Sequence, residues 1–84
     1  MTLFMTTISI TPDPALAELR ADEAEFVATA RSEGTITSIH VAEDRSTVWL
    51  TAALPDAEHV RSFISQFPYA PWFTIDSIVD VFAP

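Results

Sequence analysis

The 84-residue sequence predicts a single α+β domain with the element order βαββαβ, in which two helices cover one face of a four-stranded antiparallel sheet. Three observations predict this fold class. Four segments rich in β-branched and aromatic residues alternate with two segments whose apolar residues recur at helical spacing. Only four polar residues join the two middle strands, which is typical of an antiparallel hairpin. The length suits one domain, residues 1–84, and no linker or repeat divides it.

The N-terminal half predicts one strand and one long helix. Residues 1–11 form a strand whose alternate side chains share one face: Phe4, Thr6, Ile8 and Ile10. Asp13 and Pro14 then suit the N-cap and the first helical position, and apolar residues recur at helical spacing up to Gly34. Gly34, the only glycine, suits the left-handed conformation that follows many helices. We therefore expect one continuous helix over residues 13–33.

The C-terminal half predicts a hairpin, a second helix and a last strand. Residues 35–42 and 47–53 are rich in β-formers and should pair antiparallel across residues 43–46. Pro55 and Asp56 open a helix that ends before Pro68, with an apolar stripe of Val60, Phe63, Ile64 and Phe67. Residues 67–72 form an aromatic loop, and residues 74–81 form the fourth strand.

The strands carry apolar side chains on both of their alternating faces. In the second strand Ile39 and Val41 oppose Ile36 and Ala42, and in the last strand Ile75 and Val79 oppose Ile78 and Phe82. Strands that are apolar on both sides are normally buried on both sides. We therefore expect the sheets of two subunits to pack face to face as a dimeric α/β barrel, within a homo-oligomer that can be a larger ring.

Composition narrows the function classes. The net charge of −8, from 12 acidic and 4 basic residues, disfavours binding to nucleic acid or to anionic membrane surfaces. All basic residues are arginine, so lysine-dependent Schiff-base and P-loop chemistry is excluded. Cysteine is absent and the two histidines are far apart in the sequence, so we expect no metal site. Residues 1–10 suit neither a signal peptide nor a membrane span, which predicts a cytoplasmic location.

Glu23 is the strongest candidate for acid–base chemistry. It lies four residues after Leu19 and three and four residues before Phe26 and Val27, within the apolar stripe of the first helix. Its carboxyl group should therefore point between the helix and the sheet, where desolvation raises a pKa toward neutrality. Arg20, one turn earlier, can partner Glu23 or hold a substrate carboxylate. An ion pair between these two side chains with a purely structural role is an equal alternative.

Other candidate residues come from the strands and the aromatic loop. His40 shares a predicted strand face with Ile36, Ser38 and Ala42, and it can face either a pocket or a subunit interface. Tyr69, Trp72 and Phe73 can roof a ligand pocket, or else belong to the core or an interface. His59 lies beside Asp56 and Glu58, where a capping or solvated role is expected.

Four short motifs resemble the muconolactone Δ-isomerase family. They are Leu19–Glu23, Ser32–Thr35, Pro55 and Gln66–Trp72, and their joint spacing is similar to that of the family from Leu19 to Ile75. The resemblance implies a ferredoxin-like α+β barrel, usually decameric, that moves a proton along an allylic lactone without a cofactor. It also implies that Glu23, preceded by Asp22, carries the proton and that Arg20 clamps a carboxylate.

The chain departs from this family in its second strand. The family has Trp, Arg and His there, whereas residues 36–41 read Ile-Thr-Ser-Ile-His-Val, which favours a less anionic, hydrophobic lactone or polyketide-like substrate. We therefore expect an isomerase or cyclase of aromatic catabolism or specialised metabolism. The predicted catalytic residues are Glu23 and His40. The predicted binding residues are Arg20, Ile36, Ser38, Ile39, Trp49, Phe63, Tyr69 and Trp72. A non-catalytic small-molecule-binding or scaffold oligomer of the same fold is the alternative.

Overall fold

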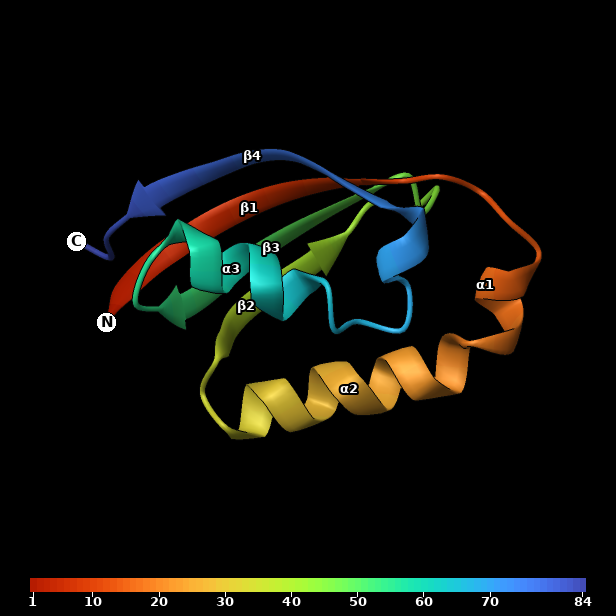
Figure 1. The fold of residues 1–84 in the computed structure, drawn as a ribbon, viewed down its shortest axis with the longest axis horizontal. Coiled ribbons are helices and arrows are strands. Elements are labelled where there is room, and N and C mark those ends of the chain that lie inside the picture. The colour runs from red at the N-terminus through yellow and green to blue at the C-terminus, as the bar shows by residue number, and fades with distance from the viewer.

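A computed structural model describes residues 1–84 and shows a four-stranded antiparallel sheet with its helices on one face (Figure 1). The elements are β1 (Thr2–Ile10), α1 (Ala15–Glu18), α2 (Arg20–Ser32), β2 (Ile36–Val41), β3 (Thr47–Leu54), α3 (Ala57–Ile64), the 3-10 turn η1 (Ala70–Trp72) and β4 (Phe73–Val81). The predicted α+β class and βαββαβ order are confirmed, and the fold is ferredoxin-like. None of the helices has the length and hydrophobicity that a membrane span requires.

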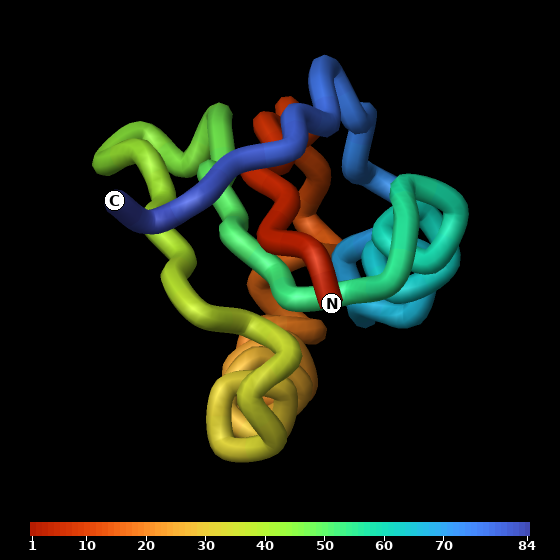
Figure 2. Tube along the Cα trace, turned by 90° about the vertical axis from the view of Figure 1, so that its left-hand side faces the viewer, coloured from red at the N-terminus to blue at the C-terminus, as the bar shows by residue number.

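The strand order β2-β3-β1-β4 places β1 and β3 in the centre of the sheet. Each neighbouring pair is antiparallel, with Thr6 opposite Leu50 and His40 opposite Trp49. Viewed along the sheet, α2 and α3 lie on the same side of the strands (Figure 2). The opposite face of the sheet carries no helix, as the sequence predicted.

The first helix is not continuous, which corrects the predicted helix over residues 13–33. It breaks at Leu19, whose backbone angles of φ −93° and ψ 1° are not those of an α-helix. In a continuous helix the Leu16 carbonyl would accept a hydrogen bond from the Arg20 N–H. Here that carbonyl accepts a hydrogen bond from the Tyr69 hydroxyl at 3.0 Å. A tertiary contact that helical periodicity cannot reveal therefore accompanies the break between α1 and α2.

Two of the helix ends follow the sequence prediction, and one differs from it by one residue. The N-cap of α1 is Pro14 instead of the predicted Asp13, whose side chain accepts a hydrogen bond from the Ala15 N–H at 2.8 Å. Gly34 has a φ of 83°, the left-handed conformation expected after α2. Asp56 accepts a hydrogen bond from the His59 N–H and thereby caps α3.

Two β-bulges change the predicted strand faces. The pairing register shifts between Ile36 and Ser38, and it shifts again where β4 passes Thr7 and Ile8 of β1. Ile36 consequently joins Ile39 on the helix-facing side, so its predicted placement beside His40 is wrong. Ile75 and Ile78 likewise both pack against the core. Strict alternation of side chains between the two faces of a strand requires an unbroken register. Because of the bulges, fewer apolar side chains of β2 and β4 lie on the helix-free face than alternation predicted.

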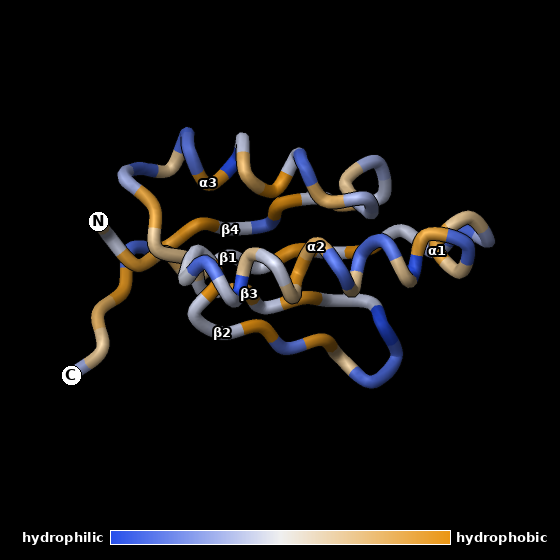
Figure 3. The backbone as a smooth tube through the Cα atoms, turned by 90° about the horizontal axis from the view of Figure 1, so that it is seen from below, coloured by the Kyte–Doolittle hydropathy of each residue, from blue (hydrophilic) through white to orange (hydrophobic).

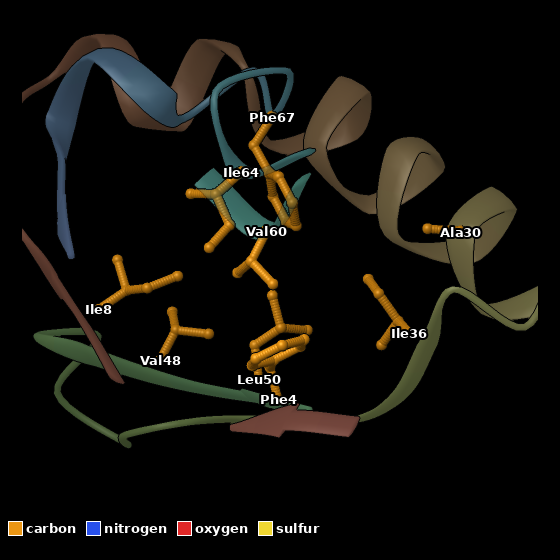
Figure 4. Close-up of a cluster of buried hydrophobic side chains, with 9 residues drawn as sticks. All are labelled: Phe4, Ile8, Ala30, Ile36, Val48, Leu50, Val60, Ile64 and Phe67. Atoms are coloured by element: carbon orange, nitrogen blue, oxygen red, sulfur yellow. The ribbon is translucent and has the colours of Figure 1, made fainter. Parts of the chain in front are cut away.

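The core lies between the sheet and the helices, and nine buried residues form it (Figure 4): Phe4, Ile8, Ala30, Ile36, Val48, Leu50, Val60, Ile64 and Phe67. Of the two long helices, α3 contributes Val60 and Ile64, whereas α2 contributes only Ala30. Most residues of α2 are therefore not buried against the sheet. Thr6 is also fully buried, and its hydroxyl has no hydrogen-bond partner.

Candidate functional site

A pocket of about 440 Å³ opens between α2 and the helix-facing side of the sheet. Eleven of its fifteen lining residues are hydrophobic. All four strands contribute to its floor, through Ile10, Ile39, Val41, Val48 and Phe73. The helix α2 forms one wall of the pocket. Only Ala30, near the C-terminus of α2, is buried against the sheet, so the earlier turns of the helix leave room for the pocket. A pocket of this volume and apolar lining suits a small organic molecule.

Glu23 is the only acidic residue that lines this pocket. Its side chain is half-buried, and its Oε1 accepts a hydrogen bond from the Tyr69 N–H at 3.1 Å. Burial raises the pKa of the Glu23 carboxyl above its ordinary value, and the hydrogen bond from Tyr69 opposes part of that rise. The structure confirms that Glu23 lies between the helix and the sheet, as the helical spacing predicted.

Tyr69 holds three parts of the chain together at the pocket. Its backbone N–H binds Glu23 of α2, and its hydroxyl donates to the Leu16 carbonyl of α1. Its ring contacts Phe73 edge-to-face, with centroids 6.3 Å apart. The turn η1 follows directly, and the Trp72 N–H donates to the Tyr69 carbonyl at 2.9 Å. Tyr69 is therefore a positioning residue for the Glu23 carboxyl.

Three of the four arginines border the pocket, namely Arg20, Arg31 and Arg45. Sequence analysis identified Arg20 but missed the other two. Arg31 was detectable, since Glu23, Val27 and Arg31 follow one another at intervals of four residues along α2. Arg45 belongs to the hairpin between β2 and β3, and only the tertiary structure brings it to the pocket. No ion pair joins Arg20 to Glu23, because the single salt bridge in the structure links His59 to Asp56.

The remaining predicted residues lie outside this pocket. His40 is paired with Trp49, and Ser38 with Thr51, on the sheet face that carries no helix. Ile36 is buried in the core, and Phe63 packs against Phe26 and Phe67.

Trp72 belongs to η1 and does not line the pocket. Within one chain the structure thus brings Glu23, Arg20, Ile39 and Tyr69 together, and it separates His40 from them. No three His, Cys, Asp or Glu side chains gather as metal ligands.

The arrangement provides a single Brønsted group in an apolar pocket bordered by cationic side chains. No model of a known protein family matches the chain, and no curated protein matches it.

Proposed function

We propose that this protein is a cofactor-independent isomerase or cyclase similar to muconolactone Δ-isomerase, with Glu23 as the general acid and base. The observation that carries the proposal is the half-buried Glu23 carboxyl, which the Tyr69 N–H holds at the wall of an apolar pocket. The resemblance of Leu19–Glu23 and Gln66–Trp72 to that family supports the same assignment.

One carboxylate is sufficient for this reaction. Ionised Glu23 removes a proton from a carbon that is allylic to a double bond and conjugated through it to a carbonyl group. The electron pair delocalises into the carbonyl, and the protonated carboxyl returns the proton at the other end of the conjugated system. The double bond moves and no oxidant or reductant is consumed. A raised pKa favours both halves of the cycle, because the carboxylate is then a stronger base and its acid form is accessible nearer neutral pH.

The pocket lining favours a mainly hydrophobic substrate. Its floor residues, among them Ile39, Val48 and Phe73, offer no polar group to a ligand. A small lactone or a polyketide-like intermediate fits this lining.

The proposed assembly is a dimer, or a larger ring built from dimers, in which the helix-free faces of two sheets pack together. That face exposes Met5, Trp49 and Val79, whose exposed fractions are 43, 42 and 53%. Large apolar side chains gathered on one sheet face favour burial against a second copy. Replacing Trp49 by Glu should yield a monomer in size-exclusion chromatography with light scattering, whereas a monomeric wild-type protein would refute the assembly.

The test is proton NMR of the purified protein with muconolactone, and with a neutral butenolide, in deuterated buffer. We expect isomerisation or deuterium incorporation with the wild-type protein and its loss with Glu23→Gln. Glu25→Gln is the matched control, because Glu25 lies on the same helix outside the pocket. Binding of either lactone without any exchange would instead support a non-catalytic binding protein.

A further inference from the structure

We infer that residues 12–19 form a lid over one end of the pocket and that the hydrogen bond from the Tyr69 hydroxyl keeps this lid closed. The inference rests on the proposed function and deepens it by naming the part of the chain that regulates access to the same pocket. The lid includes α1 and lies at the end of the molecule opposite the two chain termini, between the end of β1 and the start of α2 (Figures 1 and 3).

The first observation is that the lid is fixed at both ends but at only one point between them. Just before the lid, the Thr11 N–H donates a hydrogen bond to a carbonyl of η1 at 2.9 Å. At the other end, the Leu19 carbonyl accepts the first hydrogen bond of α2, also at 2.9 Å. Between these points, the bond from the Tyr69 hydroxyl to the Leu16 carbonyl, at 3.0 Å, is the only hydrogen bond that joins residues 12–18 to an element other than the adjoining α2.

The second observation is that α1 is held by little packing. None of its four residues is buried, and Pro12, Asp13 and Pro14, which lead into it, are exposed. A helix of four residues is not stable by itself in water, because so few hydrogen bonds do not offset the cost of starting a helix. Segments with few buried apolar contacts open locally at a low cost in free energy. The lid therefore opens without unfolding of the sheet or of α3.

The third observation is that the lid borders the pocket. Leu16 is half-buried and lines the pocket, as Tyr69 does. The Tyr69 ring contacts Phe73, and Phe73 is paired with Ile10 at the end of β1. Phe73 and Ile10 line the pocket as well. Opening of the lid therefore moves Leu16 away from Tyr69 and exposes the end of the pocket that these residues form.

Tyr69 couples this lid to the proton-transferring group. Its hydroxyl binds the lid, whereas its backbone N–H donates to the Glu23 carboxyl. A closed lid covers the end of the pocket at which Tyr69 holds this carboxyl, and it thereby limits the access of water to Glu23. A net hydrogen bond between uncharged groups shifts such an opening equilibrium by about fivefold, so one hydroxyl biases the lid toward the closed form and still lets it open for a ligand.

The test uses a cysteine as a reporter, because the chain contains no cysteine of its own. Ile10→Cys places a thiol at the covered end of the pocket, and Ser62→Cys places one at an exposed position of α3. The reaction of each thiol with the neutral reagent dithiodipyridine is followed by absorbance, both with Tyr69 present and in the Tyr69→Phe background. Phenylalanine removes only the hydroxyl and keeps the ring and the backbone N–H.

We expect the Ile10→Cys thiol to react more slowly than the Ser62→Cys thiol. Tyr69→Phe should accelerate the reaction of Ile10→Cys about fivefold and leave that of Ser62→Cys unchanged. Thr37→Val is the matched control, because the Thr37 hydroxyl also donates one hydrogen bond to a backbone carbonyl, that of Thr51 at 3.1 Å, but belongs to β2. Equal rates of the two thiols, no acceleration by Tyr69→Phe, or the same acceleration by Thr37→Val would each overturn the inference.

Hydrogen exchange of the free protein provides a second readout that needs no reporter. The Leu16 and Leu19 N–H groups are hydrogen-bonded within the lid at 3.1 and 3.2 Å, whereas the Ala53 N–H of the central strand β3 donates to the Thr35 carbonyl. Tyr69→Phe should accelerate exchange at the two lid amides about fivefold and leave Ala53 unchanged. Equal acceleration at all three amides would show a loss of global stability and would refute the role of the hydroxyl in closing a lid.

The two proposals can fail separately. Acceleration of the pocket thiol by Tyr69→Phe, with no proton exchange on any lactone, supports the lid and refutes the isomerase. Glu23-dependent proton exchange together with an unchanged thiol rate refutes the lid alone.

Discussion

Substitution of Glu23 by glutamine and by alanine separates its role as a hydrogen-bond acceptor from its role as a base. Glutamine keeps an oxygen where Oε1 accepts from the Tyr69 N–H at 3.1 Å, whereas alanine removes the acceptor. A net hydrogen bond of this kind contributes about 1 kcal/mol to stability. We therefore expect Glu23→Ala to be less stable than Glu23→Gln by about 1 kcal/mol, or roughly 4–8 °C in Tm for a domain of this size.

The pH dependence of the free energy of unfolding shows whether the charge of the Glu23 carboxylate stabilises or destabilises the fold. Because the folded-state pKa of Glu23 is raised, its contribution to stability is complete below the unfolded pKa and is lost as pH rises through the folded pKa. The pH window of this effect therefore starts near 4.5, the ordinary pKa of a glutamate side chain, and extends upward. Glu23→Gln should accordingly be at least as stable as wild type at neutral pH, and this advantage should disappear in acid.

The assay is urea denaturation followed by circular dichroism, at neutral pH and below the ordinary pKa of glutamate. Turnover of the lactone is measured on the same samples. We expect Glu23→Gln to lose about 10²- to 10⁴-fold in rate, the usual contribution of a general acid or base. If Glu23→Gln instead lost as much stability as Glu23→Ala at neutral pH, the carboxylate charge would hold the fold together and the reasoning would be refuted.

Three further predictions concern stability and are checked by the same denaturation measurements. Thr6→Val should stabilise the protein by about 1 kcal/mol or more, because the buried Thr6 hydroxyl has no partner; a loss of stability would show that the hydroxyl has one. Leu50→Ala should cost about 2–5 kcal/mol, because Leu50 is fully buried at the centre of the core, and a cost typical of surface sites would contradict that placement. Asp56 has a lowered pKa because it accepts hydrogen bonds from the ring and N–H of His59, so its stabilising effect is present above the unfolded pKa and is lost as pH falls through the folded pKa. Asp56→Ala should therefore lose stability at neutral pH and be less sensitive to acid than wild type, and an unchanged acid transition would exclude this role for the cap.

The local sequence determined the elements and several of their ends. Alternation placed Phe4, Thr6 and Ile8 on one face of β1, and in the structure all three are buried on that face. The glycine at residue 34 and the aspartate at residue 56 marked helix boundaries, because capping depends on a few neighbouring residues. Helical spacing also placed Glu23 between α2 and the sheet. These features follow from short-range geometry, which depends on a few neighbouring residues.

The tertiary structure decided which of the predicted residues share the pocket and which other residues join them. The bulges that move Ile36 and Ile75 to the helix face depend on pairing with neighbouring strands, and the break at Leu19 accompanies a hydrogen bond from Tyr69, 53 residues away from Leu16. Arg45 lines the same pocket as Glu23, whereas His40 lies on the opposite face of the sheet, and both placements depend on how the strands and helices pack together. Contacts between residues far apart in the chain leave no periodic signal in the sequence, so the place of Arg45 at the pocket emerged only when the chain was folded.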